Sequence, residues 1–289
     1  MKYRVLGRTG LNVSEIGFGG HEYRRPLPPT LGRWGETDTR EFMKKQPERN
    51  ELIQRAVELG VNYFDATQPE EAWSLGIALK EAEAREDVFV ALMILRPLSR
   101  IAGKPRSDWE RIITEDFEEK LELLQSGYAG VLNVHLPEIG YSKELLTATI
   151  ETLRGLREEG AVRWISASSH RPRFLAELIR AYDCFDSVMV RYNYHLREAR
   201  DVVFLLCKAM EVGVAVMKPI ARPYYGIPFT CFGSLGNEAV RCTQVQDSIR
   251  WILGSEEVST FVPGMNSLEE LEENGGAVER DEEIDEIWF

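Results

Sequence analysis

Short apolar, β-branched runs alternate with longer amphipathic segments along most of the chain. Eight of these runs have the length and composition of buried strands: Glu15–Phe18, Asn62–Asp65, Val88–Leu92, Gly130–Val134, Val162–Ser166, Ser187–Val190, Val214–Met217 and Thr260–Val262. The segments between them carry apolar residues at helical spacing: Glu51–Leu59, Trp109–Leu124, Lys143–Glu159, Arg173–Ala181, Arg197–Glu211, Val245–Leu253 and Ser267–Asn274. Strands that alternate with helices in this way predict an α/β protein with a closed (β/α)8 TIM barrel.

An open, doubly wound sheet is the alternative architecture. It would need a glycine-rich phosphate turn after its first strand. The stretch Gly17–Gly20 reads GFGG, which lacks the third glycine and is not followed by a helical pattern. Ahead of it, the residues Tyr3–Ile16 alternate like a β-hairpin that turns at Arg8-Thr9-Gly10. We expect this hairpin to close the bottom of the barrel.

The segment Glu22–Asn50 breaks the rhythm. It joins the first strand to the first helix, contains three prolines between Pro26 and Pro29, and carries no clear periodicity. A connection of this length is unusual, and in a barrel a βα loop lies on the catalytic face. A lid over the site and a floppy insertion are both open interpretations.

Composition narrows the class of protein. The chain has 289 residues, 44% of them hydrophobic, which suits one barrel domain over residues 1–289. Its formal net charge is -12 and no basic stripe is present, which argues against nucleic acid or an anionic membrane as partner. The four cysteines lack metal-ligand spacing, so we predict no metal site. No signal-peptide core and no apolar stretch of membrane length occur, so we predict a cytoplasmic protein.

The carboxyl ends of the predicted strands are where a barrel carries its chemistry. Asp65 closes the second strand and His135 follows the fourth. An acid and a histidine brought together at one face can act as an acid–base pair. Structural histidines are also common, so the strand positions alone leave both interpretations open.

Several motifs resemble the aldo-keto reductase family along nearly the whole chain. They read YRVLGRTGLNVSEIGFGG, AVELGVNYFDA, GLREEGAVRWISASSH, RYNYHL, GVAVMKP and VSTFVPGMNSLEELEEN. The last two resemble the bacterial and archaeal branch, some of whose members append an iron–sulfur segment, and this chain has no cysteine cluster to build one. The resemblance implies a barrel that binds NAD(P)H at its mouth and transfers a hydride to a small carbonyl substrate.

The family tetrad of acid, tyrosine, lysine and histidine is matched only in part. Asp65 matches the acid and His135 the histidine, whereas the loop after Asp65 has no tyrosine, and Glu70 or Glu71 lies nearest that place. Met93 stands where the family has the lysine that lowers the pKa of the tyrosine. We therefore take Asp65, His135 and Glu70 as the candidate catalytic residues. Asp65 should then find another cationic partner, for which Arg24 and Arg25 are candidates.

The nicotinamide end of the family's cofactor site is also altered. Ser168 and Ser169 occupy the place of the Ser-Asn pair that binds the carboxamide, and Met189 replaces a glutamine with the same role. Met217 takes a position that often holds a stacking aromatic ring. Lys218 follows it and could form a Schiff base, although a lysine before proline is also an ordinary family variant.

The phosphate end of that site corresponds to the start of the last helix, at Gly264, Met265, Asn266 and Ser267, with Glu273 and Asn274 matching the residues that contact adenine. Backbone amides at a helix N-terminus can bind a phosphate. Glu270 replaces the arginine that binds the 2′-phosphate of NADPH, which favours NADH. Ser267 to Glu270 also has the spacing of a capping box.

Three functions fit these features. The first is an NAD(P)H oxidoreductase with an altered proton donor, such as His135 or Glu70. The second is a barrel that has lost the redox step and binds a small ligand, a dinucleotide or a protein. The third is a lyase or isomerase that uses Asp65, Glu70 and His135 in acid–base chemistry. The substrate and the oligomeric state stay open.

Overall fold

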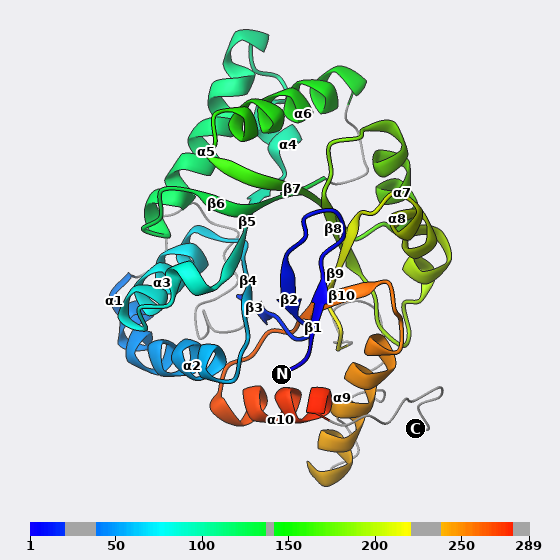
Figure 1. The fold of residues 1–289 in the computed structure, drawn as a ribbon. Coiled ribbons are helices and arrows are strands. Elements are labelled where there is room, and N and C mark those ends of the chain that lie inside the picture. The colour runs from blue at the N-terminus through cyan, green and yellow to red at the C-terminus, as the bar shows by residue number, and fades with distance from the viewer. Residues whose placement is uncertain (21–38, 137–141, 221–237, 280–289) are drawn as a thin grey trace.

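A curved parallel sheet forms the centre of the molecule in the computed structural model, which describes residues 1–20, 39–136, 142–220 and 238–279 (Figure 1). Its strands run in sequence order, from β3 to β10, and every neighbouring pair is parallel. The strands are β3 (Phe18–Gly19), β4 (Tyr63–Ala66), β5 (Phe89–Leu95), β6 (Ala129–His135), β7 (Val162–Ser169), β8 (Ser187–Arg191), β9 (Gly213–Met217) and β10 (Val258–Val262).

Backbone contacts between the two outermost strands close the sheet. Isolated parallel bridges join Ile16 to Phe261 and Gly19 to Gly264, and the Gly17 N–H donates to Phe261 O over 2.8 Å. Closure removes the free edges that an open sheet would expose. The predicted (β/α)8 barrel is confirmed.

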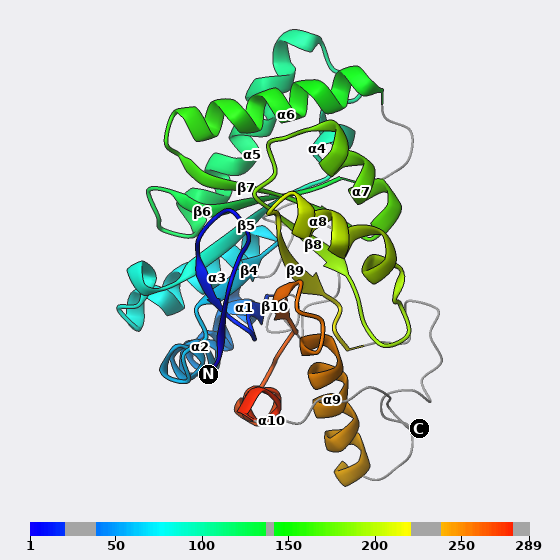
Figure 2. The same cartoon turned by 45° about the vertical axis from the view of Figure 1, so that its right-hand side comes forward.

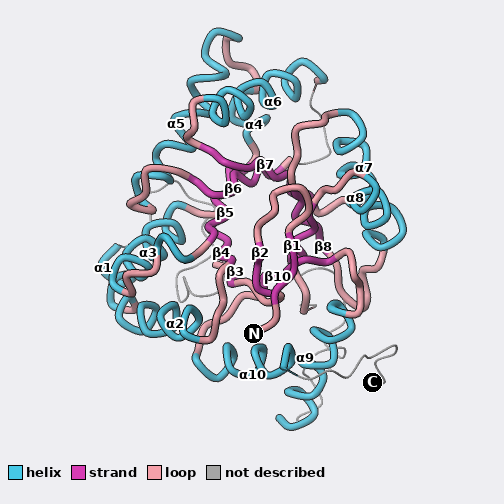
Figure 3. The backbone as a smooth tube through the Cα atoms, in the orientation of Figure 1, coloured by secondary structure: helices cyan, strands magenta, loops and turns pink. Residues whose placement is uncertain are grey.

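Helices surround the sheet on its outer side (Figures 2 and 3). They are α1 (Thr39–Lys44), α2 (Gln46–Glu58), α3 (Pro69–Glu81), α4 (Pro97–Ile101), α5 (Trp109–Leu123), α6 (Lys143–Glu158), α7 (Pro172–Ala181), α8 (Leu205–Ala209), α9 (Glu238–Leu253) and α10 (Leu268–Glu279). Short 3-10 turns at Arg85–Asp87 and Arg106–Asp108 and a π-helical turn at Arg200–Phe204 complete the set. No helix within these ranges is long and apolar enough to cross a membrane.

The long connection expected at Glu22–Asn50 is shorter than predicted. Helix α1 and the first residues of α2 lie inside it, and α2 carries a proline in its first turn, where the missing N–H costs no helical hydrogen bond. The lid question concerns residues 21–38, which lie outside the described residues, as do Arg24, Arg25 and Cys231. Helix α4 was not predicted, because five residues are too few to show a period.

The N-terminal hairpin, β1 (Tyr3–Val5) with β2 (Asn12–Ser14), lies across one end of the barrel. Gly7 forms a bridge with Val212, which directly precedes β9. Gly7 has φ +50°, and a Cβ there would lie 2.1 Å from Gly213 N, so no other residue fits this contact. The hairpin therefore covers the amino ends of the strands, as expected, and leaves the carboxyl ends for a site.

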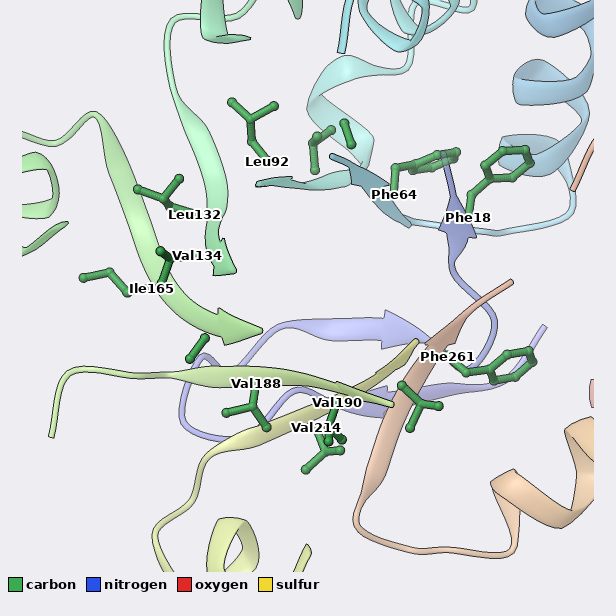
Figure 4. Packing of buried hydrophobic residues seen from close by; sticks show 14 of the residues in the cluster. Phe18, Phe64, Leu92, Leu132, Val134, Ile165, Val188, Val190, Val214 and Phe261 are labelled. Carbon is green, nitrogen blue, oxygen red and sulfur yellow. The ribbon is translucent and has the colours of Figure 1, made fainter. Parts of the chain in front are cut away.

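The two faces of the sheet bury different sets of side chains. The outward face packs against the helices, and Figure 4 shows part of this layer, with Phe18, Phe64, Leu92, Leu132, Val134, Ile165, Val188, Val190, Val214 and Phe261 labelled. The inward face forms a smaller cluster with the hairpin: Leu6, Leu11, Val13, Tyr63, Ala91, Met93, Val131, Met189, Ala215, Met217 and Val262. Successive strand residues alternate between the two layers, so each residue at a strand end can be assigned to the wall or to the interior.

Candidate active site at the barrel mouth

Five strands bring inward-facing residues to the same end of the barrel. Asp65 on β4, His135 on β6, Ser168 on β7, Arg191 on β8 and Met217 on β9 all share the inward face of their strands. His135 pairs in register with Ser168, and Arg191 with Met217. Because parallel strands end at one edge, these side chains surround one opening, which we call the mouth.

The acidic part of the mouth is built by the turn between β4 and α3. The Thr67 hydroxyl donates to Asp65 Oδ2 over 3.2 Å, and Glu71 Oε2 accepts the Thr67 and Gln68 N–H groups at 2.8 and 3.1 Å. The Glu71 carboxylate thus caps the helix that begins at Pro69. A Cβ on Gly20 would lie 3.0 Å from Glu71 Oε2, so glycine lets β3 approach this turn.

Both glutamates of the first turn of α3 are buried. Glu71 is 0% exposed and Glu70 is 4% exposed. Glu71 carries the described contacts to the turn, so its carboxylate has a structural role there. Glu70, the predicted acid, lies at the start of the same helix and beside the same turn. The acidic part of the mouth therefore comes from the turn between β4 and the start of α3.

His135 is largely buried at the end of β6. Burial, and then the positive charge of Arg96, lower the pKa of His135 to about 4, so the imidazole is neutral near pH 7. Its ring lies edge-on to His170, with centroids 5.4 Å apart. Neither ring nitrogen has a hydrogen-bond partner among the described residues, which leaves the neutral N–H able to donate to a ligand.

A buried ion network lies behind this part of the wall, on the helix side of β5. Lys120 of α5 is 1% exposed, and its ammonium donates to Met93 O over 2.6 Å. It lies 3.6 Å from Asp116 Oδ2, while Arg100 lies 2.8 Å from Asp116 Oδ1. Burial lowers the pKa of Lys120, and Asp116 opposes that shift. The cation here approaches the Met93 backbone from outside, whereas the Met93 side chain lines the interior.

A tyrosine occurs on β4, but not at the mouth. Tyr63 precedes Asp65 by two residues on the inward face and packs with the hairpin residues Leu6, Leu11 and Val13. Burial, and then the charge of Asp65, raise its pKa above the ordinary tyrosine value. A fully buried phenol with a raised pKa at the closed end is poorly placed to donate a proton at the mouth.

The predicted carboxamide-binding pair is divided between the two faces of β7. Ser168 points inward, is 0% exposed, and its hydroxyl has no hydrogen-bond partner among the described residues. Ser169 belongs to the outward face, and its hydroxyl accepts the Arg171 N–H over 3.2 Å. Asn133, also inward, donates to Met189 Sδ over 3.4 Å and leaves Oδ1 without a described partner. Unsatisfied polar atoms thus collect inside the barrel beneath the mouth.

The end of β9 is held in an unusual backbone conformation. Met217 is 7% exposed and faces the interior, and Lys218 follows with φ +57°. The Asn193 side chain donates to Lys218 O over 3.0 Å and fixes this turn. Left-handed conformations of non-glycine residues are sparse and often occur at functional sites.

The start of α10 is already bound by a side chain of the protein. Glu270 Oε2 accepts the Asn266 N–H over 2.7 Å, and Ser267 Oγ accepts the Glu270 N–H over 3.3 Å. Met265 and Asn274 are buried, at 0% and 3% exposure, and Gln246 donates to Glu273 O over 3.0 Å. The Ser267–Glu270 pair therefore caps the helix, and a phosphate at Asn266 would have to displace a carboxylate.

Three residues near the site were assigned no role from the sequence. Arg191 ends β8 on the inward face, Arg96 precedes α4 with φ +51°, and Lys120 lies on the buried face of α5. The sequence did carry a signal for Lys120, because it follows the apolar Phe117 by three residues on one helix face. No group of three or more His, Cys, Asp or Glu side chains suited to a metal occurs within the described residues.

Comparison with known proteins agrees with this geometry. The aldo/keto reductase family profile matches residues 30–225. L-Galactose dehydrogenase of Arabidopsis thaliana is 26% identical over 304 aligned residues, covering 96% of this chain and 88% of that protein.

Solved structures of similar proteins share the fold. The holo form of an aldo-keto reductase from Bacillus halodurans is 25% identical, with a TM-score of 0.70, and covers 97% of this chain and 91% of its own. An aldo/keto reductase from Klebsiella pneumoniae, solved with NADP and acetate, has a TM-score of 0.72 at 16% identity. The match covers 97% of this chain and 91% of that one. The chain therefore belongs to the aldo/keto reductase family.

Proposed function

We propose that the protein is an oxidoreductase that uses NAD(P)H to interconvert a small carbonyl compound and its alcohol. One observation carries the proposal: two hydrogen-bonding groups, the Ser168 hydroxyl and the His135 ring, lie on adjacent strands at the mouth without described partners. Buried polar groups that stay unsatisfied cost about 1–3 kcal/mol each, so they persist where a ligand completes them.

The residues at the mouth suit the nicotinamide end of the cofactor. Ser168 can bind the carboxamide, and Met217 offers an apolar face against the ring. Ser169 faces away and holds the backbone of Arg171, which makes it a support of the loop rather than a ligand contact. NAD(P)H, when bound, supplies the hydride. The fit rests on Ser168, because Met189 has no amide to offer.

Reduction adds a hydride to the carbonyl carbon and a proton to the carbonyl oxygen. With a pKa of about 4, His135 is neutral at pH 7, so its N–H can polarise the oxygen but is a poor source of the proton. We assign delivery of the proton to Glu70, which would relay it from solvent at the acidic part of the mouth. Asp65, held by the Thr67 hydroxyl, orients that turn.

A redox-inactive barrel that binds a ligand is the second candidate. The observation in its favour is the position of Lys120, which reaches β5 from the helix side and hydrogen-bonds to the Met93 backbone. No lysine of the described residues replaces the Met93 side chain on the inward face of β5, so the tetrad is degenerate in this proposal. Binding without turnover would then be the expected behaviour.

Titration with NADH and NADPH, read by nicotinamide fluorescence, separates these candidates at the binding step. Turnover of a panel of aldehydes then tests the chemistry. His135→Ala should lower kcat at least about tenfold and leave folding intact, because the imidazole would contact the reacting oxygen. An active enzyme unaffected by this change would rule out the named mechanism. If neither dinucleotide binds at millimolar concentration, the oxidoreductase is excluded and the redox-inactive, ligand-binding barrel is the remaining candidate.

Glu270 makes the cofactor preference testable. The Glu270 carboxylate accepts a hydrogen bond from the Asn266 N–H, and its negative charge would repel a 2′-phosphate. NADH should therefore bind more tightly than NADPH. Glu270→Gln should improve NADPH affinity about three- to tenfold relative to NADH, since one negative charge is lost. Glu272→Gln, on the same helix and paired with Arg55 at the surface, is the control and should change neither. An equal response of both variants would contradict the assignment.

A further inference from the structure

Arg191 is a charged residue inside the mouth that the proposed reaction does not use. It ends β8, two residues after Met189, which belongs to the inward cluster, while Val188 and Val190 pack in the outer layer. Alternation therefore directs the Arg191 side chain inward. Its register partner is Met217, another inward residue beside the proposed nicotinamide position.

The Arg191 guanidinium has no acidic partner among the described residues. Within the described residues Arg191 forms no ion pair, and its Nε is buried without a hydrogen-bond acceptor. Arginines on the outer surface behave differently: Arg173 lies 2.8 Å from Glu198, and Arg157 lies 3.1 Å from Asp186. The chain has 47 acidic residues, yet none of the described carboxylates forms an ion pair with Arg191. An arginine left without an acceptor at a strand end indicates an anion supplied from outside.

The neighbouring groups on the same side of the mouth are also donors or cations. Ser168 on β7 and His135 on β6 offer an O–H and an N–H, and Arg96 is close enough to lower the His135 pKa. The acidic residues Asp65 and Glu70 belong to β4 and α3. In the strand order β4 lies four strands from β8, which is the opposite side of an eight-stranded barrel. The mouth is therefore polarised, with one side suited to a negative group.

We propose that Arg191 binds a carboxylate of the substrate and so makes this a site for carbonyl compounds that also carry a carboxylate. The carbonyl part of this substrate class rests on the proposed function, whereas the anion site does not. Alternate strands lie about 10 Å apart, and the arginine side chain reaches inward from β8. A carbonyl at His135 and a carboxylate at Arg191 would then be separated by only a few bonds. The substrate class is a short oxo acid, with the alcohol product a hydroxy acid.

The test measures binding without turnover. Benzoate and its neutral analogue benzamide are titrated into the full chain by calorimetry, with no nicotinamide present. Benzoate should bind about tenfold or more tightly than benzamide, and its affinity should fall as salt rises. Arg191→Met should remove that preference and leave benzamide unchanged, while Arg191→Lys should retain part of it, because lysine keeps the charge without the fork of donors.

A matched control and a stability measurement exclude an indirect effect. Arg173→Met makes the same substitution at a surface arginine and should leave benzoate binding unchanged. Arg191→Met should not lower the melting temperature, because the side chain loses no described ion pair. If benzoate and benzamide bind equally to the wild type, or if Arg191→Met keeps the preference, the proposal is wrong.

A final arm separates the substrate from the cofactor as the source of the anion. NADH affinity, measured by fluorescence, should differ less than about twofold between the wild type and Arg191→Met. A large loss of NADH affinity with benzoate binding retained would assign Arg191 to the cofactor phosphates and overturn the proposal. Retained benzoate preference in a protein that binds neither NADH nor NADPH would instead reject the oxidoreductase while keeping the anion site.

Discussion

Charged and polar groups are buried on both sides of the wall formed by β5 to β8, but they are treated in opposite ways. On the helix side, Asp116 is ion-paired with both Lys120 and Arg100, and Lys120 also donates to a backbone carbonyl. On the inner side, Ser168 and Arg191 keep buried atoms with no described partner. Two cations surround the Asp116 carboxylate on the helix side, whereas no described side chain of opposite charge pairs with Arg191 on the inner side. Burial alone would not distinguish the two sets.

Breaking the outer network should give the largest effect on stability. Lys120→Met removes the cation from a fully buried Asp116 and the donor from Met93 O, which should cost about 3 kcal/mol in the free energy of unfolding. Urea denaturation measures it. Lys208→Met, at a surface lysine 3.4 Å from Glu256, should cost under about 0.5 kcal/mol.

The double variant sharpens this result. Replacing Asp116 and Lys120 together by Leu and Met should recover part of the loss, because no buried charge is then left without its partner. Ligand binding at the mouth should not change in any of these variants that stay folded. A loss below about 1 kcal/mol for Lys120→Met would contradict a structural role for the network.

Acidification should act on the inner side through His135. Its pKa in the folded protein is about 4, below the unfolded value of about 6.5, so the unfolded chain binds the proton first. Stability should therefore fall as pH drops below about 6.5 and level off below about 4. The loss between pH 7 and pH 5 should be about 2 kcal/mol.

Chemical denaturation at the two pH values, with the histidine replaced, isolates this contribution. His135→Gln should be less sensitive to pH over that interval by about 2 kcal/mol, whereas Ser168→Ala should keep the dependence of the wild type. A wild type and a His135→Gln variant with the same pH dependence would show that the imidazole titrates normally.

The smallest effect on stability should come from the two adjacent serines, which test the comparison directly. Ser168→Ala should leave the free energy of unfolding unchanged or raise it by up to about 1 kcal/mol, because the hydroxyl loses no described partner and an unsatisfied buried group is removed. Ser169→Ala should cost about 1 kcal/mol, because it removes the acceptor of the Arg171 N–H. Nicotinamide binding should respond in the reverse order, weaker in Ser168→Ala and unchanged in Ser169→Ala. A larger stability loss for Ser168→Ala would mean that its hydroxyl supports the fold.

The architecture could be predicted from the sequence because each strand and helix has its own local period. The hairpin, the eight strands and the barrel closure all follow the predicted order. The strand boundaries differ from the prediction where backbone pairing between strands, rather than the hydrophobic pattern, decides where a strand begins. The first strand was predicted at Glu15–Phe18, but Ile16 and Gly17 meet β10 only through isolated contacts, so the paired strand is Phe18–Gly19.

The site was harder to predict, because the role of each residue depends on which face of its strand or helix the side chain occupies. The adjacent Ser168 and Ser169 look equivalent in sequence, yet the register of β7 sends them to opposite sides of the wall. Glu70 and Glu71 likewise follow one another, and the contacts of the turn select Glu71 as the cap. Arg191 could have been assigned from its spacing to Met189, once the inward face of β8 was known. The lack of a partner for Arg191 within the described parts of the chain depends on three-dimensional packing.

The covered end of the barrel offers a practical handle for the binding measurements. Met1 packs beside Gly60, and the Tyr3 hydroxyl donates to Gly60 O over 2.9 Å, just ahead of β4. The N-terminal residue thus emerges at the face opposite Asp65, His135 and Arg191. A linker attached through Met1 would fix the molecule to a sensor chip with its opening toward the solution. Immobilised and free protein should then give the same affinities.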